Sequence, residues 1–429
     1  MKTTITGVSA WEVLDSRGTP TVACEVRLGG GACAAAAVPS GASTGTHEAR
    51  EARDGGPRYG GRGVRRAVAN VRDVLGPAVV GRDAEDQAGL DAALRAADGT
   101  PTLGRVGANA VLAVSVASMR AAAAASGVPL YRRLSGDADP LLPLPMINII
   151  SGGAHAGGTV DIQDFLIVPI GATTFAQAIE WAWRVRQGTV AVAAKRGLPV
   201  ALVADEGGLG PPLPSNRAAL ELLVDGIAHA GLRLGTEVAL AVDVAATQLL
   251  HGGRYHLAAE GRVLDGAALL DELVSWCADY AIVSLEDPMG EDDWATWATA
   301  SARLGGRLQI LGDDLFVTDL QRLERGIADG VANAVLVKPN QTGTLSDARA
   351  VVVRAQQAGY ATVVSARSGD TEDAWLADLA VGWRAGQIKV GSLTRAERTA
   401  KWNRLLRIEA EAGGRATFAG RAALGLSSG

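Results

Sequence analysis

The chain has 429 residues, of which 48% are hydrophobic and 20% are charged, with a formal net charge of −5. This length allows two domains, or one barrel with a substantial extension, around a large core. The charge is mild and its two signs are interspersed, which excludes the basic surface typical of a nucleic-acid-binding protein.

Membrane insertion and secretion are not indicated. The longest apolar region, 108–125, contains Asn109 and Arg120 and is rich in alanine, so it predicts a buried helix and not a membrane span. Residues 1–6 lack the apolar core of a signal peptide. The cysteines are odd in number and have no metal-ligand spacing: Cys24, Cys33 and Cys277. We therefore expect a cytoplasmic protein without membrane or nucleic-acid partners.

The first domain is predicted to be α+β over residues 1–135. Three strands, 5–14, 21–28 and 32–38, are separated by short turns rich in glycine. The segment 39–45 then has small, hydroxyl-bearing residues that can fold over a ligand, although a surface turn has the same composition. Helical spacing follows, with one apolar face formed by Val64, Ala67, Val68, Val71 and Leu75.

Residues 136–145 are rich in proline, which predicts a connection to a second domain over 146–429. That domain opens with an apolar strand and a glycine-rich loop that carries His155. A lone histidine is often structural, but its place between flexible glycines favours a functional role. The strand 160–168 follows, and 395–412 predicts a final surface helix with its apolar side facing in.

Short apolar runs alternate with helix-length segments through the second domain, which predicts a β/α barrel. Three runs end on a carboxylate, namely Asp243, Glu286 and Asp313. The strands of such a barrel end at one mouth, so these side chains are expected to converge. Carboxylates that converge repel one another unless a cation holds them, and a set of oxygen ligands favours Mg²⁺.

Basic residues end the next three runs, and a further acid precedes them. Lys338, Arg367 and Lys389 end runs of strand length, and the run 199–206 ends at Glu206. A mouth with acids on one side and bases on the other suits a small, multiply charged anion bridged to metal. Salt bridges at a barrel rim are the structural alternative, but charges facing a common cavity are costly without a ligand.

Seven motifs occur in an order that resembles the enolase family, the phosphopyruvate hydratases of glycolysis. The resemblance covers essentially the whole chain. The motifs are DSRGTPT (15–21), PSGASTG (39–45), DEGG (205–208), SLED (284–287), GDDLFVT (312–318), RSGDTED (367–373) and GQIKVGS (386–392).

The resemblance implies an N-terminal α+β capping domain on a TIM-like, enolase-type β/α barrel, usually in a homodimer. It also implies two Mg²⁺ ions in each active site. The first ion would be held by Asp243, Glu286 and Asp313, and Ser40 in the loop 39–45 matches the residue that helps to hold the second.

The same resemblance implies the roles of the remaining residues. Lys338 matches the base that takes the C2 proton of 2-phosphoglycerate, and Glu206 matches the acid that protonates the departing hydroxyl. Two Mg²⁺ ions and Lys389 are expected to stabilise the negative charge that develops and to lower the pKa of Lys338. The positions that match substrate contacts are Gln163, His155, Arg367 and Ser368.

Several positions depart from the family pattern. Asp164 stands where a glutamate is expected near the leaving hydroxyl, and Ala366 where a histidine precedes the arginine–serine pair. Ser151 replaces an asparagine, and 247–250 replaces a more polar, aromatic segment. Neutral drift in a working enolase is one interpretation. A specialised paralogue, such as carboxyphosphonoenolpyruvate synthase, is the other.

A binding protein that keeps the fold without catalysis is a third hypothesis. The retention of Lys338, Glu206 and all three predicted metal carboxylates argues against it. The sequence therefore predicts a Mg²⁺-dependent lyase that acts on a small phosphorylated carboxylic acid.

Overall fold

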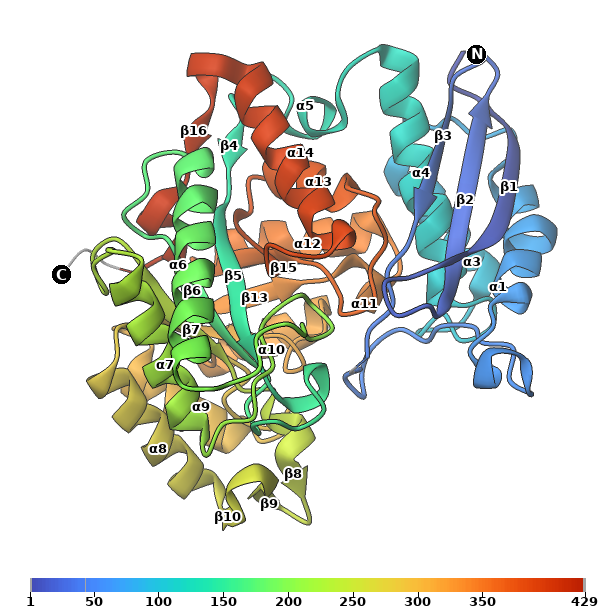
Figure 1. Cartoon of the computed structure of the whole chain (residues 1–429). Helices are drawn as coiled ribbons and strands as arrows, with labels where there is room; N and C mark the ends of the chain where they lie inside the picture. Colours follow the sequence, from blue (N-terminus) through green and yellow to red (C-terminus); the bar gives the residue numbers. More distant parts are fainter. Residues whose placement is uncertain (1, 43, 427–429) are drawn as a thin grey trace.

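The computed structural model describes residues 2–42 and 44–426, which form a smaller N-terminal part beside a closed barrel (Figure 1). The N-terminal part begins with an antiparallel sheet in the strand order β1-β2-β3. Its strands are β1 (Ile5–Leu14), β2 (Pro20–Leu28) and β3 (Cys33–Ala37). The three predicted strands are thus confirmed, with differences of one residue at the ends of the second and third.

Helices complete the N-terminal part. They are α1 (Arg65–Asn70), α2 (Gly76–Val79), α3 (Gln87–Asp98), α4 (Ala108–Ser126) and α5 (Leu130–Ser135), with a π-helical turn between α1 and α2. The apolar face predicted here is buried, apart from the half-buried Val68.

The helix α4 packs against β2 and β3, behind the sheet in the view of Figure 1. By length and composition it is the one helix among the described residues that is able to cross a membrane. However, 83% of its apolar window is buried inside the protein. The predicted buried helix is therefore confirmed, because its apolar surface is already covered.

Eight strands close the barrel in the spatial order β11-β12-β13-β14-β15-β5-β6-β7. They are β5 (Leu144–Ser151), β6 (Asp164–Val168), β7 (Ala239–Asp243), β11 (Ile282–Glu286), β12 (Gln309–Gly312), β13 (Ala334–Val337), β14 (Ala361–Ser365) and β15 (Gly386–Gly391). Only β6 runs antiparallel to its neighbours. Its first residue therefore lies at the end of the barrel where the other strands finish.

Helices surround the strands and cover their outer faces (Figure 1). They are α6 (Phe175–Lys195), α7 (Asn216–His229), α8 (Gly266–Asp279), α9 (Trp294–Leu304), α10 (Leu320–Asp329), α11 (Pro339–Thr342), α12 (Leu345–Gln357), α13 (Trp375–Gly382) and α14 (Ala396–Ala412). Two helices, α6 and α7, separate β6 from β7, whereas a single long helix follows most later strands.

Alternate residues of each strand face opposite sides of the barrel wall. On β6, Leu166 and Val168 belong to a compact apolar cluster, while Phe165 and Ile167 belong to the larger core shared with the helices. Apolar side chains thus fill the barrel on one side of the wall and bind the helices on the other. The predicted fold class, an α/β barrel with an N-terminal α+β part, is confirmed.

The prediction of a strand over 199–206 is wrong. This segment is a loop with one isolated bridge, between Val203 and Leu209. Leu202 is 81% exposed. The physical reason is that β6 and β7 already pair with each other, which leaves no strand position between them. Similarly, only 164–168 of the strand expected over 160–168 is formed.

The range predicted as a connection contains short strands. β4 (Leu141–Leu142) pairs with β16 (Thr417–Phe418), and β5 begins at Leu144. A separate three-stranded sheet, β8 (Leu250–His251), β9 (Arg254–Leu257) and β10 (Arg262–Leu264), follows β7.

The last long helix, α14, fixes the backbone at the barrel mouth. Its apolar side buries Trp402, Leu405 and Ile408, as predicted, and Leu406 is half-buried. Its fully buried Arg398 donates hydrogen bonds to the carbonyl of Val390, at 2.9 Å, and to that of Arg367, at 2.7 Å. The guanidinium therefore joins β15 to the segment that follows β14.

Candidate active site

Three predicted carboxylates lie at or next to the ends of adjacent parallel strands. Asp243 ends β7, Glu286 ends β11, and Asp313 directly follows β12. All three side chains are buried. The order of the strands in the barrel, and not their distance in sequence, places the three at the same end of the barrel.

Two lysines compensate the charge of these acids. The Nζ atom of Lys389 donates to Asp243 Oδ2 and to Glu286 Oε2, both at 2.7 Å, and Lys338 Nζ donates to Asp313 Oδ2. Burial disfavours both ammonium groups, but the facing carboxylates outweigh it and raise the pKa of each lysine. Without a metal, therefore, the lysines and the carboxylates form ion pairs.

The donor set at this mouth also fits a divalent cation. Burial and the nearby Asp243 raise the pKa of Glu286 well above its ordinary value. Its Oε1 atom is buried and has no hydrogen-bond partner among the described residues. An orphaned carboxylate oxygen beside further carboxylates is a suitable ligand for a hard ion.

A fourth acid, Asp287, orders the backbone behind the first three. Its two carboxylate oxygens accept hydrogen bonds from the backbone amides of Asp313, at 2.9 Å, and Asp314, at 2.7 Å. Carboxylate oxygens of Asp287, Asp313 and Asp314 lie within 4.8 Å of one another. Burial, and then Asp313, raise the pKa of Asp314 to about 8. The motif 284–287 contained Asp287, but the spacing gave no sign of this role.

The predicted anion-binding side lies next to the N-terminal part. Arg367 Nη1 and Nη2 donate to the two carboxylate oxygens of Glu48, at 2.9 and 3.2 Å. The hydroxyl of Ser368 accepts from the amide of Ala42 at 2.7 Å. The sequence did not single out Glu48, because its partner Arg367 is more than 300 residues away.

Ser40 lies in this same region, held by a backbone bridge to Gly369. Its hydroxyl accepts from Arg53 at 2.8 Å and donates to Glu51 Oε2 at 3.2 Å. Within the described ranges, its hydroxyl partners are these two residues and not the three carboxylates. Residue 43 of the predicted loop lies outside the described residues.

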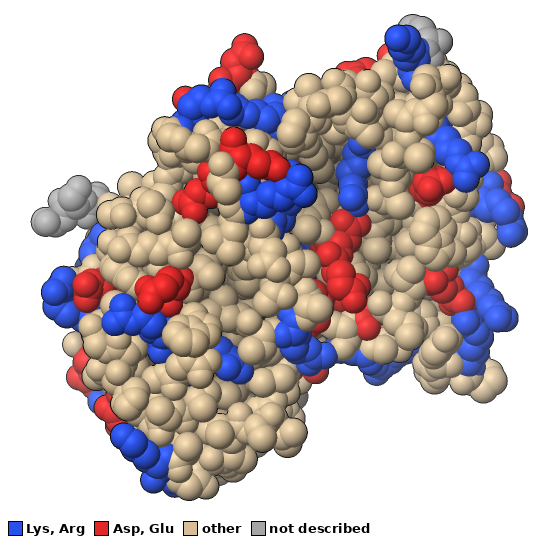
Figure 2. All heavy atoms as spheres, turned by 45° about the horizontal axis from the view of Figure 1, so that its top comes forward, with Lys and Arg blue, Asp and Glu red and all other residues tan. Residues whose placement is uncertain are grey.

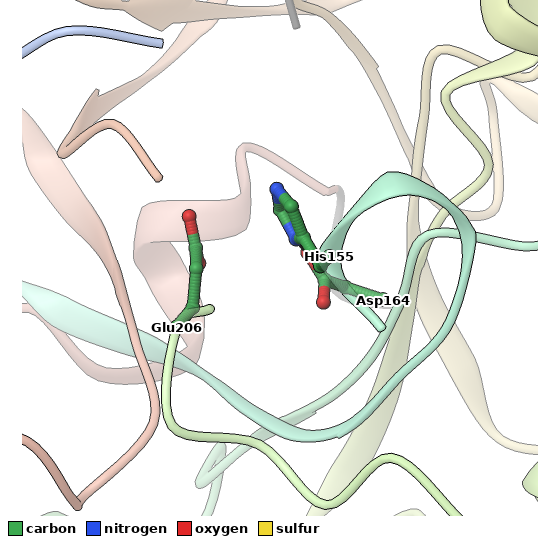
Figure 3. A group of neighbouring side chains, drawn as sticks. All are labelled: His155, Asp164 and Glu206. Carbon is green, nitrogen blue, oxygen red and sulfur yellow. Dashed lines mark hydrogen bonds and ion pairs between the residues drawn. The ribbon is translucent and has the colours of Figure 1, made fainter. Parts of the chain in front are cut away.

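A second cluster joins His155, Asp164 and Glu206, whose ligand atoms lie within 4.8 Å of one another (Figure 3). His155 Nδ1 lies 2.9 Å from Asp164 Oδ2. Burial disfavours the imidazolium, but Asp164 and Glu206 outweigh it and raise the pKa of His155 to about 9. Burial alone would raise the pKa of Glu206, but His155 and Arg398 hold it below its ordinary value. The cluster therefore contains a cationic imidazole beside an ionised carboxylate.

One cavity is lined both by the lysines that pair with the three carboxylates and by residues of the His155 cluster. Most of the predicted catalytic and substrate-binding residues line it, together with the predicted metal ligand Asp243 and with Ser365, Ala366 and Val390. These catalytic and substrate-binding residues are His155, Gln163, Glu206, Lys338, Arg367, Ser368 and Lys389. Glu286 and Asp313 adjoin the cavity through their lysine partners, and Asp164 lies behind His155.

The cavity carries both signs of charge within a molecule whose surface charges are mixed. Figure 2 shows acidic and basic side chains interspersed over one face, with acids gathered in the hollow where the two parts meet. The arrangement can hold a small anion with its acidic groups near the lysines and Arg367, next to a cationic imidazole.

We expect the imidazole of His155 to titrate near pH 9 in metal-free protein and at a lower pH in Asp164→Asn, which removes the largest of the charges that raise its pKa. The raised pKa stabilises the folded state fully below the unfolded value of roughly 6.5. That contribution is lost as the pH rises through about 9. Nitrogen NMR of histidine-labelled protein, assigned with His155→Gln, measures it. A titration near 6.5 in both proteins would contradict the ion pair.

Residues 5–134 match the enolase N-terminal domain, and residues 139–425 match the enolase C-terminal TIM barrel domain. These two matches cover nearly the whole chain and agree with the barrel and the N-terminal part described above. The chain belongs to the enolase family.

Proposed function

We propose that the protein is a Mg²⁺-dependent hydro-lyase that converts 2-phosphoglycerate into phosphoenolpyruvate. The supporting observation is a single cavity lined by Lys338, Lys389 and Arg367, with three buried carboxylates at its edge. Such a cavity matches a substrate with a carboxylate, a phosphate and a weakly acidic C–H bond. A cytoplasmic location and a homodimer belong to the same proposal. The location rests on the pattern of residues 1–6 and of the cysteines, and the homodimer rests on family resemblance.

The carboxylates Asp243, Glu286 and Asp313 would hold one Mg²⁺ ion, and Ser40 would contribute to a second. When bound, Mg²⁺ would stabilise the negative charge that develops on the substrate carboxylate. Lys389 adds a positive charge to the same side of the cavity. Asp313 now pairs with Lys338, so its engagement elsewhere is needed before the lysine can lose its proton.

In the proposed reaction, neutral Lys338 takes the C2 proton and becomes an ammonium. The electron pair of the C2–H bond forms the C2–C3 double bond as the C3–O bond breaks. The departing hydroxyl takes a proton from the Glu206–His155 side of the cavity and leaves as water. Arg367 and Ser368 hold the phosphate, where a planar guanidinium can donate to two oxygens at once.

The first test measures phosphoenolpyruvate formation by its absorbance, with and without Mg²⁺. We expect a turnover of roughly 1 to 1000 per second that depends on Mg²⁺. We expect Lys338→Ala to reduce it by about a thousandfold or more, because the base is removed. Lys195→Ala, an exposed lysine at the end of α6, is the matched control.

Unchanged thermal unfolding of Lys338→Ala would show that the loss is chemical and not structural. Normal turnover in this variant would refute the assignment of Lys338 as base. Mg²⁺-dependent stabilisation without turnover of any phosphoglycerate-like acid would instead support a binding protein.

We expect Asp243→Asn to weaken Mg²⁺ binding by about tenfold or more, since the site loses one of its ligand charges. Titration calorimetry with MgCl₂ measures this directly and does not require turnover. Asp271→Asn changes an exposed aspartate on α8 and should leave the affinity unchanged. Equal Mg²⁺ affinity in both variants would place the metal elsewhere.

A second candidate function is a specialised enolpyruvate synthesis, with a carboxyphosphonate in place of the phosphate. The observation that favours it is Ala366, whose small side chain lines the cavity beside Arg367 and Ser368. A methyl group at this position leaves room for a larger anion and offers no hydrogen-bond donor.

The double variant Asp164→Glu, Ala366→His separates the two candidates. The specialised enzyme predicts that dehydration of 2-phosphoglycerate rises by about tenfold or more, because the expected leaving-group carboxylate and phosphate donor are restored. A working enolase predicts no gain. The measurement is the rate of phosphoenolpyruvate formation, and Ala366→His alone shows which position is responsible.

A further inference from the structure

The carboxylate of Asp164 is fully buried and accepts hydrogen bonds from three side chains. Oδ1 accepts from the side-chain amide of Asn148 and from the Ser151 hydroxyl, the latter at 2.9 Å. Oδ2 lies 2.9 Å from His155 Nδ1. Asn148 also donates to the Ser151 hydroxyl oxygen at 2.7 Å. Both oxygens of Asp164 are therefore occupied from inside the protein.

The number of hydrogen atoms that each side chain can donate fixes the direction of these hydrogen bonds. Asn148 has two N–H groups, which point at Ser151 and Asp164, and Ser151 has one hydroxyl hydrogen, which is directed to Asp164. Because the imidazole is cationic at neutral pH, both ring nitrogens carry hydrogen, and Nδ1 donates to the Asp164 carboxylate. Figure 3 shows the other ring nitrogen of His155 pointing away from Asp164.

The network has no room to rearrange. Ser151 ends β5 and pairs in register with Asp164, the first residue of the reversed strand β6. A Cβ atom at Gly208 would lie 2.7 Å from the Ser151 hydroxyl and 3.2 Å from the Asn148 amide nitrogen. Glycine at 208 is therefore needed for the close approach that encloses the two side chains.

The same geometry argues against two direct roles for Asp164. It is not among the residues that line the cavity, whereas His155 and Glu206 are. A cation shared by His155, Asp164 and Glu206 would have to displace donors that already occupy the Asp164 oxygens. Asp164 can therefore influence the cavity through His155, which it contacts and which lines the cavity.

We propose that Asp164, held by Asn148 and Ser151, is a positioning residue that fixes the imidazole of His155 with its Nε2–H group facing the cavity. This inference rests on the proposed function for its reaction. In that reaction, Nε2–H is a proton donor next to Glu206 on the leaving-group side. After transfer of the Nε2 proton, the imidazole is neutral and keeps its Nδ1 hydrogen bond to Asp164.

The test uses Ser151→Ala and the isosteric Asp164→Asn, each alone and combined with His155→Gln. Ser118→Ala is the matched control, because Ser118 is also fully buried but its hydroxyl has no partner among the described residues. The readouts are kcat and KM for 2-phosphoglycerate with Mg²⁺, and the ring nitrogen signals of His155 by NMR.

We expect Ser151→Ala to lower kcat by about tenfold with little change in KM, and Asp164→Asn to lower it further. In the His155→Gln background neither substitution should cost more, because a residue that acts through His155 has nothing left to position. Both substitutions should shift the His155 signals, and Ser118→Ala should not.

Additive losses in the His155→Gln background would overturn the proposal, as would unchanged His155 signals in Asp164→Asn. The NMR readout does not need turnover. Absence of phosphoenolpyruvate formation by the unmodified protein therefore contradicts the proposed function alone, and the positioning role is still decided by the signals.

Discussion

Compensation of buried charge at the barrel mouth is the constraint on which the rest of the site depends. Asp243, Glu286 and Asp313 are acids in a low-dielectric environment, and each is paired with Lys389 or Lys338. Removing either partner of such a pair leaves an uncompensated charge, which is strongly destabilising. Any cation that binds the acids must therefore be balanced by a change at the lysines. This links the charge of the proposed base to occupation of the proposed metal site.

The reversed strand β6 explains why the cluster of His155, Asp164 and Glu206 lies at the same end of the barrel as the three carboxylates. In an all-parallel barrel, the first residue of this strand would lie at the opposite end. Because β6 runs the other way, Asp164 lies in register between Ser151 and Asp243. His155 and Glu206 therefore line the same cavity as Asp243, while Arg398 on α14 holds the backbone beside it. The proposed proton acceptor, Lys338, and the proposed donor, His155, thus line the same cavity from different strands and loops.

Much of this arrangement could be predicted from local sequence, because strand-length apolar runs ending in charged residues follow directly from barrel geometry. The errors have physical causes. The run 199–206 has strand composition, but its place in the barrel is already taken by the pairing of β6 with β7. Glu48 was missed because its contact with Arg367 forms only when the two parts of the chain meet. The roles of Asn148 and Asp287 were missed for a related reason, since a buried hydrogen bond leaves no periodic signal in the sequence.

The hydrogen-bond network around Asp164 and the three carboxylates differ in how much of the chain must fold before they form. His155, Ser151 and Asn148 lie within 16 residues of Asp164, so their network closes only a short loop. The three carboxylates belong to strands separated by whole helices, and they meet only after those strands have paired around the barrel. A ligand that requires all three binds the closed barrel and not its open forms. By linkage, such a ligand would raise the free energy of opening the barrel wall, so a cation bound at the proposed metal site would stabilise the closed fold in addition to its proposed part in the reaction.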